Sequence, residues 1–321
     1  GSPIQGDVFV MPSSDVTVSA SITAISYNIT VTQPENGTIS SNKNTATLGE
    51  TVTLSNTPDT NYDFDHYTVN GDAIVGNTFT MPASDVTVSG SFTINYNPLN
   101  LPAGTVRVRT SDGNAPVKNS NTSYESATLV SGTSDTYDAY KSGNYFTYLL
   151  SGSTNVVEVL GANLSNVTEM RYMFGDCSNL TTVALFDTSN ATNMERMFTN
   201  CSALTTIPKF DTSKVMNMFG MFISCGELTS VPLLNTSRVT SMASMMVNCG
   251  KLTSIPLFDT SSVTNIRYAF QNCYKVQTGA LALYQQAISQ ATPPSNHLST
   301  FNNCGRDTVT GAAELAQIPS D

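Results

Sequence analysis

The feature that most constrains the fold is a 24-residue repeat in the second half of the chain. Cys177, Cys201, Cys225, Cys249 and Cys273 follow one another at intervals of 24 residues, and each ends a similar phrase, from MRYMFGDC to IRYAFQNC. A tail of the type LTTIPKFDTSK follows each of the first four. A fixed period of this length indicates stacked units, none of which can bury its apolar face alone.

Each repeat is predicted to contain a short helix followed by a short strand. The phrase from Val167 to Cys177 places apolar residues at i, i+3, i+7 and i+10, which is one stripe of a helix of about three turns. Thr192 and Glu195 form a capping-box pattern at the start of the next phrase. Small cysteines and adaptable methionines at equivalent positions are expected to be buried, with the thiols free.

The repeat resembles the BspA-like leucine-rich repeat surface proteins, in the form V-T-N-M-x-x-M-F-x-N-C-x-x-L-T-S-I-P-L-F-D-T-S, over about residues 143–306. The resemblance implies a capped leucine-rich-repeat solenoid over residues 143–321, with parallel strands on one face and short helices on the other. It also implies a bacterial surface or secreted protein that attaches to host matrix, other microbes or glycoconjugates. Lys209 departs from the pattern because it occupies the place of Leu185, Leu233 and Leu257.

A second repeat occupies the first part of the chain. The segment FVMPSSDVTVSASI, from Phe9, returns as FTMPASDVTVSGSF, from Phe79. Between them, alternating runs separated by Pro, Asn and Gly predict a small all-β module over residues 25–94. Its phrases ITVTQPENGTIS and YTVNGDAIVGNTFTMPASDVTVSGSF resemble the divergent internalin B repeats, which implies a spacer on a bacterial surface protein.

The expected fold class is therefore α+β and modular. Residues 1–24 are interpreted as the tail of a preceding β repeat, and residues 95–142 as a linker and N-terminal cap of the solenoid. The chain has 321 residues and no run of about 18 apolar residues that would predict a membrane span. Gly1-Ser2-Pro3 is interpreted as a cloning remnant, so we expect a surface or secreted protein, anchored to the outer membrane as a lipoprotein, whose leader has been removed.

The composition leaves little chemistry for catalysis. A formal charge of −10 disfavours nucleic acid, and the chain has two histidines, His66 and His297, and no Trp. Asp187, Asp211 and Asp259 recur at a turn and are interpreted as Asx-turn residues. We therefore expect no enzyme, cofactor or metal site, with a hydrolase using unrecognised carboxylates as the least favoured alternative.

The remaining candidate is a surface on the strand half of the repeats, which we expect to face solvent in a monomer. Its hydroxyls, prolines and one cation form an uncharged strip suited to an extracellular protein or glycan, although the absence of Trp weakens the glycan option. A solvated face with no partner, in a structural stalk or surface coat, is the alternative. The predicted partner-binding residues are Thr182, Thr206, Ser230, Ser254, Pro208, Pro232, Pro256 and Lys209.

Overall fold

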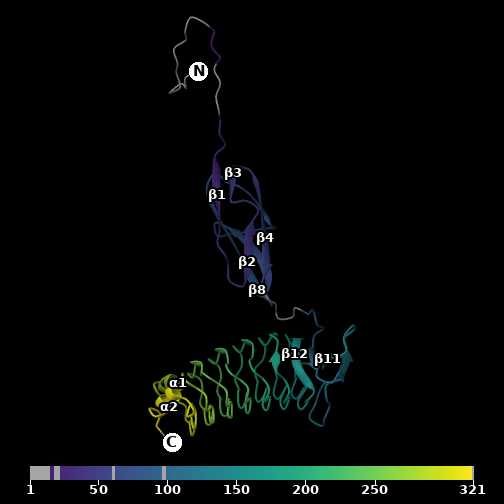
Figure 1. Cartoon of the computed structure of the whole chain (residues 1–321), viewed down its shortest axis with the longest axis vertical. Coiled ribbons are helices and arrows are strands. Elements are labelled where there is room, and N and C mark those ends of the chain that lie inside the picture. Colours follow the sequence, from purple (N-terminus) through teal and green to yellow (C-terminus); the bar gives the residue numbers. More distant parts are fainter. Residues whose placement is uncertain (1–14, 18–21, 60–61, 96–98, 320–321) are drawn as a thin grey trace. The chain divides into compact units, whose positions relative to one another are not determined.

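The computed structural model describes residues 15–17, 22–59, 62–95 and 99–319. The chain divides into two compact units, residues 1–94 and 95–321 (Figure 1). The predicted repeat tail at residues 1–24 lies mostly outside the described residues.

The first unit is a two-sheet β domain. Strands β1, β3, β5, β6 and β8 form one sheet in the order β3-β1-β8-β5-β6, and β2, β4 and β7 form the other in the order β2-β4-β7. The pairing of β1 with β8 is parallel, and the other pairs are antiparallel. The predicted all-β module is therefore confirmed. The strands are β1 (Ser26–Val31), β2 (Gly37–Ser41), β3 (Thr45–Thr47), β4 (Thr51–Pro58), β5 (Tyr62–Val69), β6 (Asp72–Ile74), β7 (Thr78–Thr80) and β8 (Val86–Ile94).

Alternation along these strands builds the core of the first unit. Val52 and Leu54 on β4 and Val88 on β8 are buried, whereas the residues between them reach the surface. Asn70 and Gly71 join β5 to β6 with φ values of 54° and 93°. Positive φ at both central residues is what a two-residue hairpin turn of type I′ requires, and Asn-Gly supplies it at little cost.

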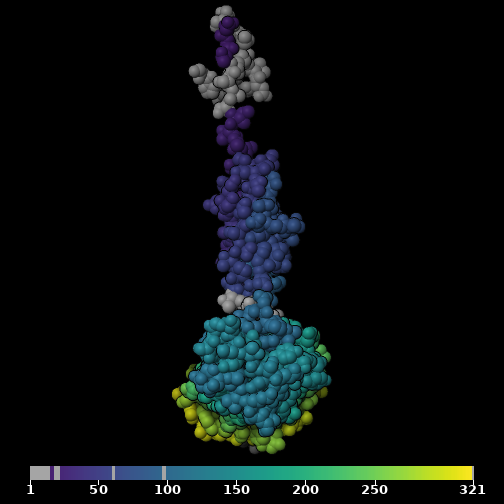
Figure 2. Space-filling view, turned by 90° about the vertical axis from the view of Figure 1, so that its right-hand side faces the viewer, coloured from purple at the N-terminus to yellow at the C-terminus, as the bar shows by residue number. Residues whose placement is uncertain are grey.

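The second unit opens with a five-stranded sheet, β10-β11-β9-β12-β13, which forms the near side of this unit in Figure 2. Strand β9 lies between β11 and β12, antiparallel to both. Strand β12 then pairs in parallel with the two-residue strand β13, which belongs to the first cysteine-containing repeat. The sheet thus covers the apolar side of the first repeats. The strands are β9 (Thr105–Thr110), β10 (Ser126–Leu129), β11 (Thr136–Tyr140), β12 (Val156–Asn163) and β13 (Thr182–Val183).

Consecutive repeats are joined by backbone hydrogen bonds about one period apart. The N–H groups of residues 194, 196, 198 and 200 donate to the carbonyls of residues 217, 219, 221 and 223, over 2.7–3.1 Å. Single parallel bridges lie at the start of each repeat, and the same rows of bonds recur from one repeat to the next. The successive repeats form a row of similar backbone turns in Figure 1. The bridges within this series are Tyr145↔Glu169, Glu169↔Asn193, Asn193↔Asn217, Asn217↔Ser241 and Ser241↔Asn265.

The predicted leucine-rich-repeat solenoid, with helices on one face and parallel strands on the other, is wrong. The phrase predicted to be helical contains two consecutive β-turns, closed by bonds such as Met197 N–H to Met194 O and Cys201 N–H to Phe198 O. Arg196 and Asn200, at the third position of these turns, have φ values of 53° and 58°. A right-handed helix cannot contain such left-handed residues, whereas a type II turn requires one at this position.

The strand half of the repeat does not form a continuous sheet either. In the first repeat the Ala184 N–H donates to Val159 O and extends the pairing of β13. Later repeats have Pro208, Pro232 and Pro256 at this place, and proline has no N–H to donate. Within the described residues, the two helices are α1 (Ala280–Ile288) and α2 (Val309–Leu315), both beyond the last cysteine of the regular series. The second unit is therefore built mainly of turns and short strands.

The apolar residues of the repeats nevertheless share one continuous core. Phe198 is fully buried and stacks on Phe174 and Phe222, with ring centroids 5.5 and 5.8 Å away and interplanar angles of 12° and 1°. The six cysteines are buried and free, as predicted. The Cys201 thiol donates to the Phe174 carbonyl in the preceding repeat, and four other cysteines make the same bond at 3.0–3.1 Å.

Candidate functional site

The eight predicted residues belong to the tail of four successive repeats, and we call them the hydroxyl–proline face. Thr182, Thr206, Ser230 and Lys209 are exposed. Ser254 and the three prolines are half-buried. Four of the eight residues are thus exposed to solvent, and the backbone of this face is not the regular sheet that was expected.

The hydroxyl groups of Thr206 and Ser230 differ from that of Thr182 in their hydrogen bonding. Thr182 donates to Glu158 Oε1 over 3.2 Å, and Glu158 in turn accepts from Arg109 Nη1 over 2.6 Å. The Thr206 and Ser230 hydroxyls make no hydrogen bond with any described residue. These two hydroxyls are therefore the ones that a partner can engage without displacing an internal bond.

The neighbouring threonines, one position earlier in each repeat, use their hydroxyls to bond to the preceding repeat. Thr205 Oγ1 donates to Thr181 O over 3.3 Å, Thr229 repeats this bond to Thr205, and Thr253 repeats it to Thr229. Their backbone N–H groups donate to the same carbonyls. This row strengthens the joint between repeats and leaves its hydroxyl hydrogens unavailable to a ligand.

Exposed leucines follow the prolines of the hydroxyl–proline face. The sequence analysis did not predict that these leucines would be exposed. Leu185 is half-buried, but Leu233 and Leu257 each keep 54% of their surface exposed, and Lys209 continues the same row. These leucines directly follow Pro232 and Pro256, which are also partly exposed. Exposed leucines thus follow the hydroxyl–proline residues of two repeats within three residues of Ser230 and Ser254.

The recurrent carboxylates are occupied by turn bonds, as predicted. Asp187 and Asp211 accept the N–H of the serine two residues later, over 2.8 and 2.9 Å. The hydroxyl and backbone N–H of Ser261 hold the pKa of Asp259 below its usual range. Between Asp and Ser, the buried Thr212 donates to Asn235 O of the next repeat over 2.8 Å. These groups stabilise the corner of each repeat.

The column of thiols is chemically protected. Burial raises the pKa of Cys177 and of Cys225 to about 12, because a thiolate in this core would lose its hydration. Burial likewise raises the pKa of Cys201. Thiols held in the protonated form are poor nucleophiles and poor metal ligands. Among the described residues, no group of three His, Cys, Asp or Glu side chains is placed to hold a metal ion.

A column of aromatic and arginine side chains was missed in the sequence. Tyr148 stacks on Tyr172 with centroids 4.8 Å apart, and the Arg196 guanidinium lies over the other side, 5.4 Å from the Tyr172 ring. Arg196 also lies 5.0 Å from the Phe219 ring, and its Nη1 donates to the Tyr172 hydroxyl. The signal was available, since Tyr148, Tyr172 and Arg196 are spaced by 24 residues.

Two family models match parts of the chain. Residues 27–96 match the divergent InlB B-repeat domain, and the two-sheet unit coincides with this match. Residues 27–96 are a divergent InlB B-repeat domain. Residues 146–254 and 205–303 match, in two overlapping spans, a family described as Mycoplasma protein of unknown function. These matches do not show the BspA-like leucine-rich repeat.

No curated protein and no solved structure matches the chain. The two family matches fit an extracellular or cell-surface protein. In the described part of the chain, none of the helices has the length and apolar character needed to cross a membrane.

Proposed function

We propose that this chain is a bacterial cell-surface binding protein without catalytic activity. In this proposal the InlB-type domain is a spacer and the hydroxyl–proline face binds an extracellular protein or glycan. The exposed Leu233 and Leu257 and the free hydroxyls of Thr206 and Ser230 support it most, because the tails of successive repeats keep these groups accessible instead of burying the leucines. An apolar strip with hydrogen-bonding neighbours is typical of an interaction surface.

A protein partner is favoured over a glycan. Protein interfaces bury apolar side chains such as Leu and Pro at their centre, whereas sugar rings stack on open aromatic faces. None of the eight residues of the hydroxyl–proline face is aromatic. The chain also has no Trp. We therefore propose an extended protein segment that places apolar side chains against the leucine row.

Arrays of extracellular matrix proteins and glycans, probed with the whole chain, test this proposal. The double variant Thr206→Glu and Ser230→Glu places two carboxylates on the hydroxyl–proline face and should weaken binding by about tenfold or more, because a partner that covers the face must strip both of their hydration. A matched control, Ser131→Glu and Thr154→Glu, adds the same charge at exposed positions outside the face. The control should bind like the unaltered chain.

The preference for protein has a separate test. Leu233→Thr with Leu257→Thr replaces the two exposed apolar side chains by smaller polar ones, so it should weaken binding to a protein ligand. Binding that survives both double variants would move the site elsewhere. Binding to glycans alone would contradict the protein assignment.

A structural surface coat is the second candidate function. The row of threonines that bond to the preceding repeat favours it. The Thr205 and Thr229 hydroxyls bond to the preceding repeat, which is a stabilising and not a recognition role. The circular dichroism and unfolding midpoint first establish that the chain on the arrays is folded. Absence of binding on both arrays would then support the coat and refute the binding role.

Lipoprotein anchoring is the remaining part of the proposal. It rests on the surface-type family matches and not on any residue of the described structure. Mass spectrometry of the natural protein, extracted from membranes, should find a lipid-modified N-terminal cysteine. A natural protein recovered in the medium without lipid would contradict the anchor.

A further inference from the structure

The repeat register breaks once, at the C-terminal end of the second unit. Asn303 bonds to Asn272 across 31 residues, whereas the corresponding bond between Asn272 and Asn248 spans 24. The additional residues belong to the segment that contains α1. Together with α2, this segment covers the last repeat of the second unit.

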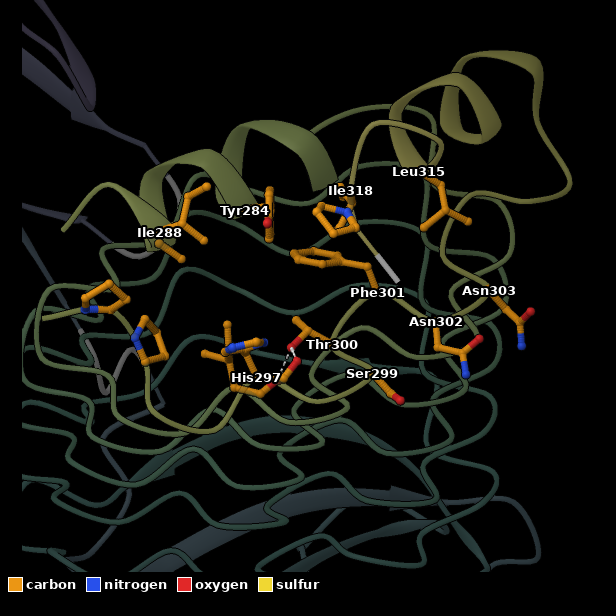
Figure 3. A pocket seen from close by; sticks show the side chains of 15 residues that line it. Tyr284, Ile288, His297, Ser299, Thr300, Phe301, Asn302, Asn303, Leu315 and Ile318 are labelled. Atoms are coloured by element: carbon orange, nitrogen blue, oxygen red, sulfur yellow. Dashed lines mark hydrogen bonds between the residues drawn. The ribbon is translucent and has the colours of Figure 1, made fainter. Parts of the chain in front are cut away.

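This cover is not close-packed. It encloses a cavity of about 450 Å³ between α1, the segment after α2 and residues 293–303. In Figure 3, Tyr284 and Ile288 project from α1 into one wall, Leu315 and Ile318 contribute to the next, and Thr300 and Phe301 lie opposite. Protein interiors seldom keep empty spaces larger than a water molecule, and cavities of about 300–1,000 Å³ are typical of small-molecule sites.

The lining indicates a neutral and mainly apolar ligand. The described lining residues include no Asp, Glu, Lys or Arg. The Thr300 hydroxyl is engaged by the Ile266 and His297 carbonyls, at 3.0 and 2.6 Å. Asn302 is exposed, and its side-chain amide makes no hydrogen bond with a described residue. His297, Ser299 and Asn303 also line the cavity. A charged ligand would therefore lose its hydration without meeting an oppositely charged Asp, Glu, Lys or Arg side chain, whereas one polar edge could bond to Asn302.

The phenylalanine column identifies the shape of the ligand. Phe270 stacks on Phe301 with centroids 5.5 Å apart and an interplanar angle of 9°, which repeats the stacking of Phe174 on Phe198. Met246 separates this pair from the stack of Phe174, Phe198 and Phe222. Phe301 ends the pair, has no further ring partner among the described residues, and lines the cavity with the 5% of its surface that is exposed. A planar ring in the cavity would continue the column at the spacing that the repeats already use.

We propose that this cavity binds a small neutral molecule with one or two fused aromatic rings, stacked on Phe301. The site is separate from the hydroxyl–proline face and does not depend on the function proposed for that face. The volume of about 450 Å³ exceeds that of a single protein side chain, so a free small molecule fills it better than one inserted residue of a protein partner.

Fluorescence of the neutral dye N-phenyl-1-naphthylamine, titrated against the whole chain, tests the site. Ala287 is buried and lines the cavity, so Ala287→Phe fills the space and should weaken dye binding by about tenfold or more. Ala282→Phe is the matched control, because it adds the same ring to the exposed side of α1. It should leave dye binding unchanged, and the unfolding midpoints of both variants should show that the cap remains folded.

Competition separates ring stacking from simple apolar binding. Naphthalene should displace the dye about tenfold more effectively than decalin, its saturated counterpart, and Phe301→Leu should remove this preference while keeping an apolar cavity. Equal competition by naphthalene and decalin would overturn the aromatic assignment. Absence of dye binding to the folded chain, or equal effects of Ala287→Phe and Ala282→Phe, would overturn the site itself.

Discussion

Truncation of Phe198 to alanine should remove a large part of the stability of the second unit. The side chain is fully buried and lies between two parallel rings, with Phe174 at 5.5 Å and Phe222 at 5.8 Å. Truncating a buried Phe costs about 3–5 kcal/mol, and each ring pair is worth about 0.5–1.5 kcal/mol beyond its buried area. Because two pairs are lost in a core shared by consecutive repeats, we expect about 4–5 kcal/mol.

The assay is equilibrium denaturation by urea, followed by near-ultraviolet circular dichroism of the tyrosines. Because the chain has two units, it can show two unfolding transitions. The unfolding transition of residues 95–321 is assigned first, by comparison with variants in the first unit. Phe219→Ala is the matched control, since this ring is only partly buried and contacts Arg196, and it should cost less than about 2 kcal/mol. A cost for Phe198→Ala no larger than that of the control would refute the reasoning.

Two further predictions concern the thiols and the turn hydroxyls. Folding raises the pKa of Cys177 and Cys225 to about 12 from the ordinary value of 9.0, so the folded state holds these protons more tightly and stability should fall as pH rises from 9 towards 12. Iodoacetamide should accordingly leave the six thiols unmodified at pH 8 in the folded chain and label them in denaturant; rapid labelling of the folded chain would contradict their burial. Thr212→Val keeps the side-chain shape but leaves the Asn235 carbonyl unpaired, and should cost about 1–3 kcal/mol in urea unfolding. Thr205→Val is the exposed counterpart and should cost less, and equal costs would show that the buried turn hydroxyl has no special role.

The sequence predicted the apolar core of the repeats well but not the path of the backbone through it. Burial of the Phe, Met and Cys positions follows from the 24-residue period, whatever the local conformation. A stripe at i, i+3, i+7 and i+10 also fits two consecutive turns that each return an apolar side chain inwards. The residue before four of the five regularly spaced cysteines gave a signal, because Asp and Asn are among the residues that best tolerate positive φ. These residues are Asp176, Asn200, Asn248 and Asn272.

The prediction of a parallel sheet in the strand half of the repeats was wrong for a reason that the sequence also shows. Pro208, Pro232 and Pro256 each lack the backbone N–H that would pair their repeat with the preceding one. A regular parallel sheet therefore could not extend past β13. The exposed leucines beside these prolines follow from the same irregularity. The cavity could not be predicted, because it depends on how α1 and α2 fold back over Phe301, and no repeat specifies that arrangement.

The hydrogen-bond partner of the Phe198 amide tests the stacking of repeats most directly. The structure places this N–H 2.9 Å from the carbonyl oxygen of Met221, whereas a helical phrase would direct it to Met194. Scalar coupling through the hydrogen bond, measured by NMR on the isotopically labelled chain, identifies the acceptor. We predict a coupling between the Phe198 nitrogen and the Met221 carbonyl carbon. A coupling to the Met194 carbonyl carbon would contradict this account of the repeats.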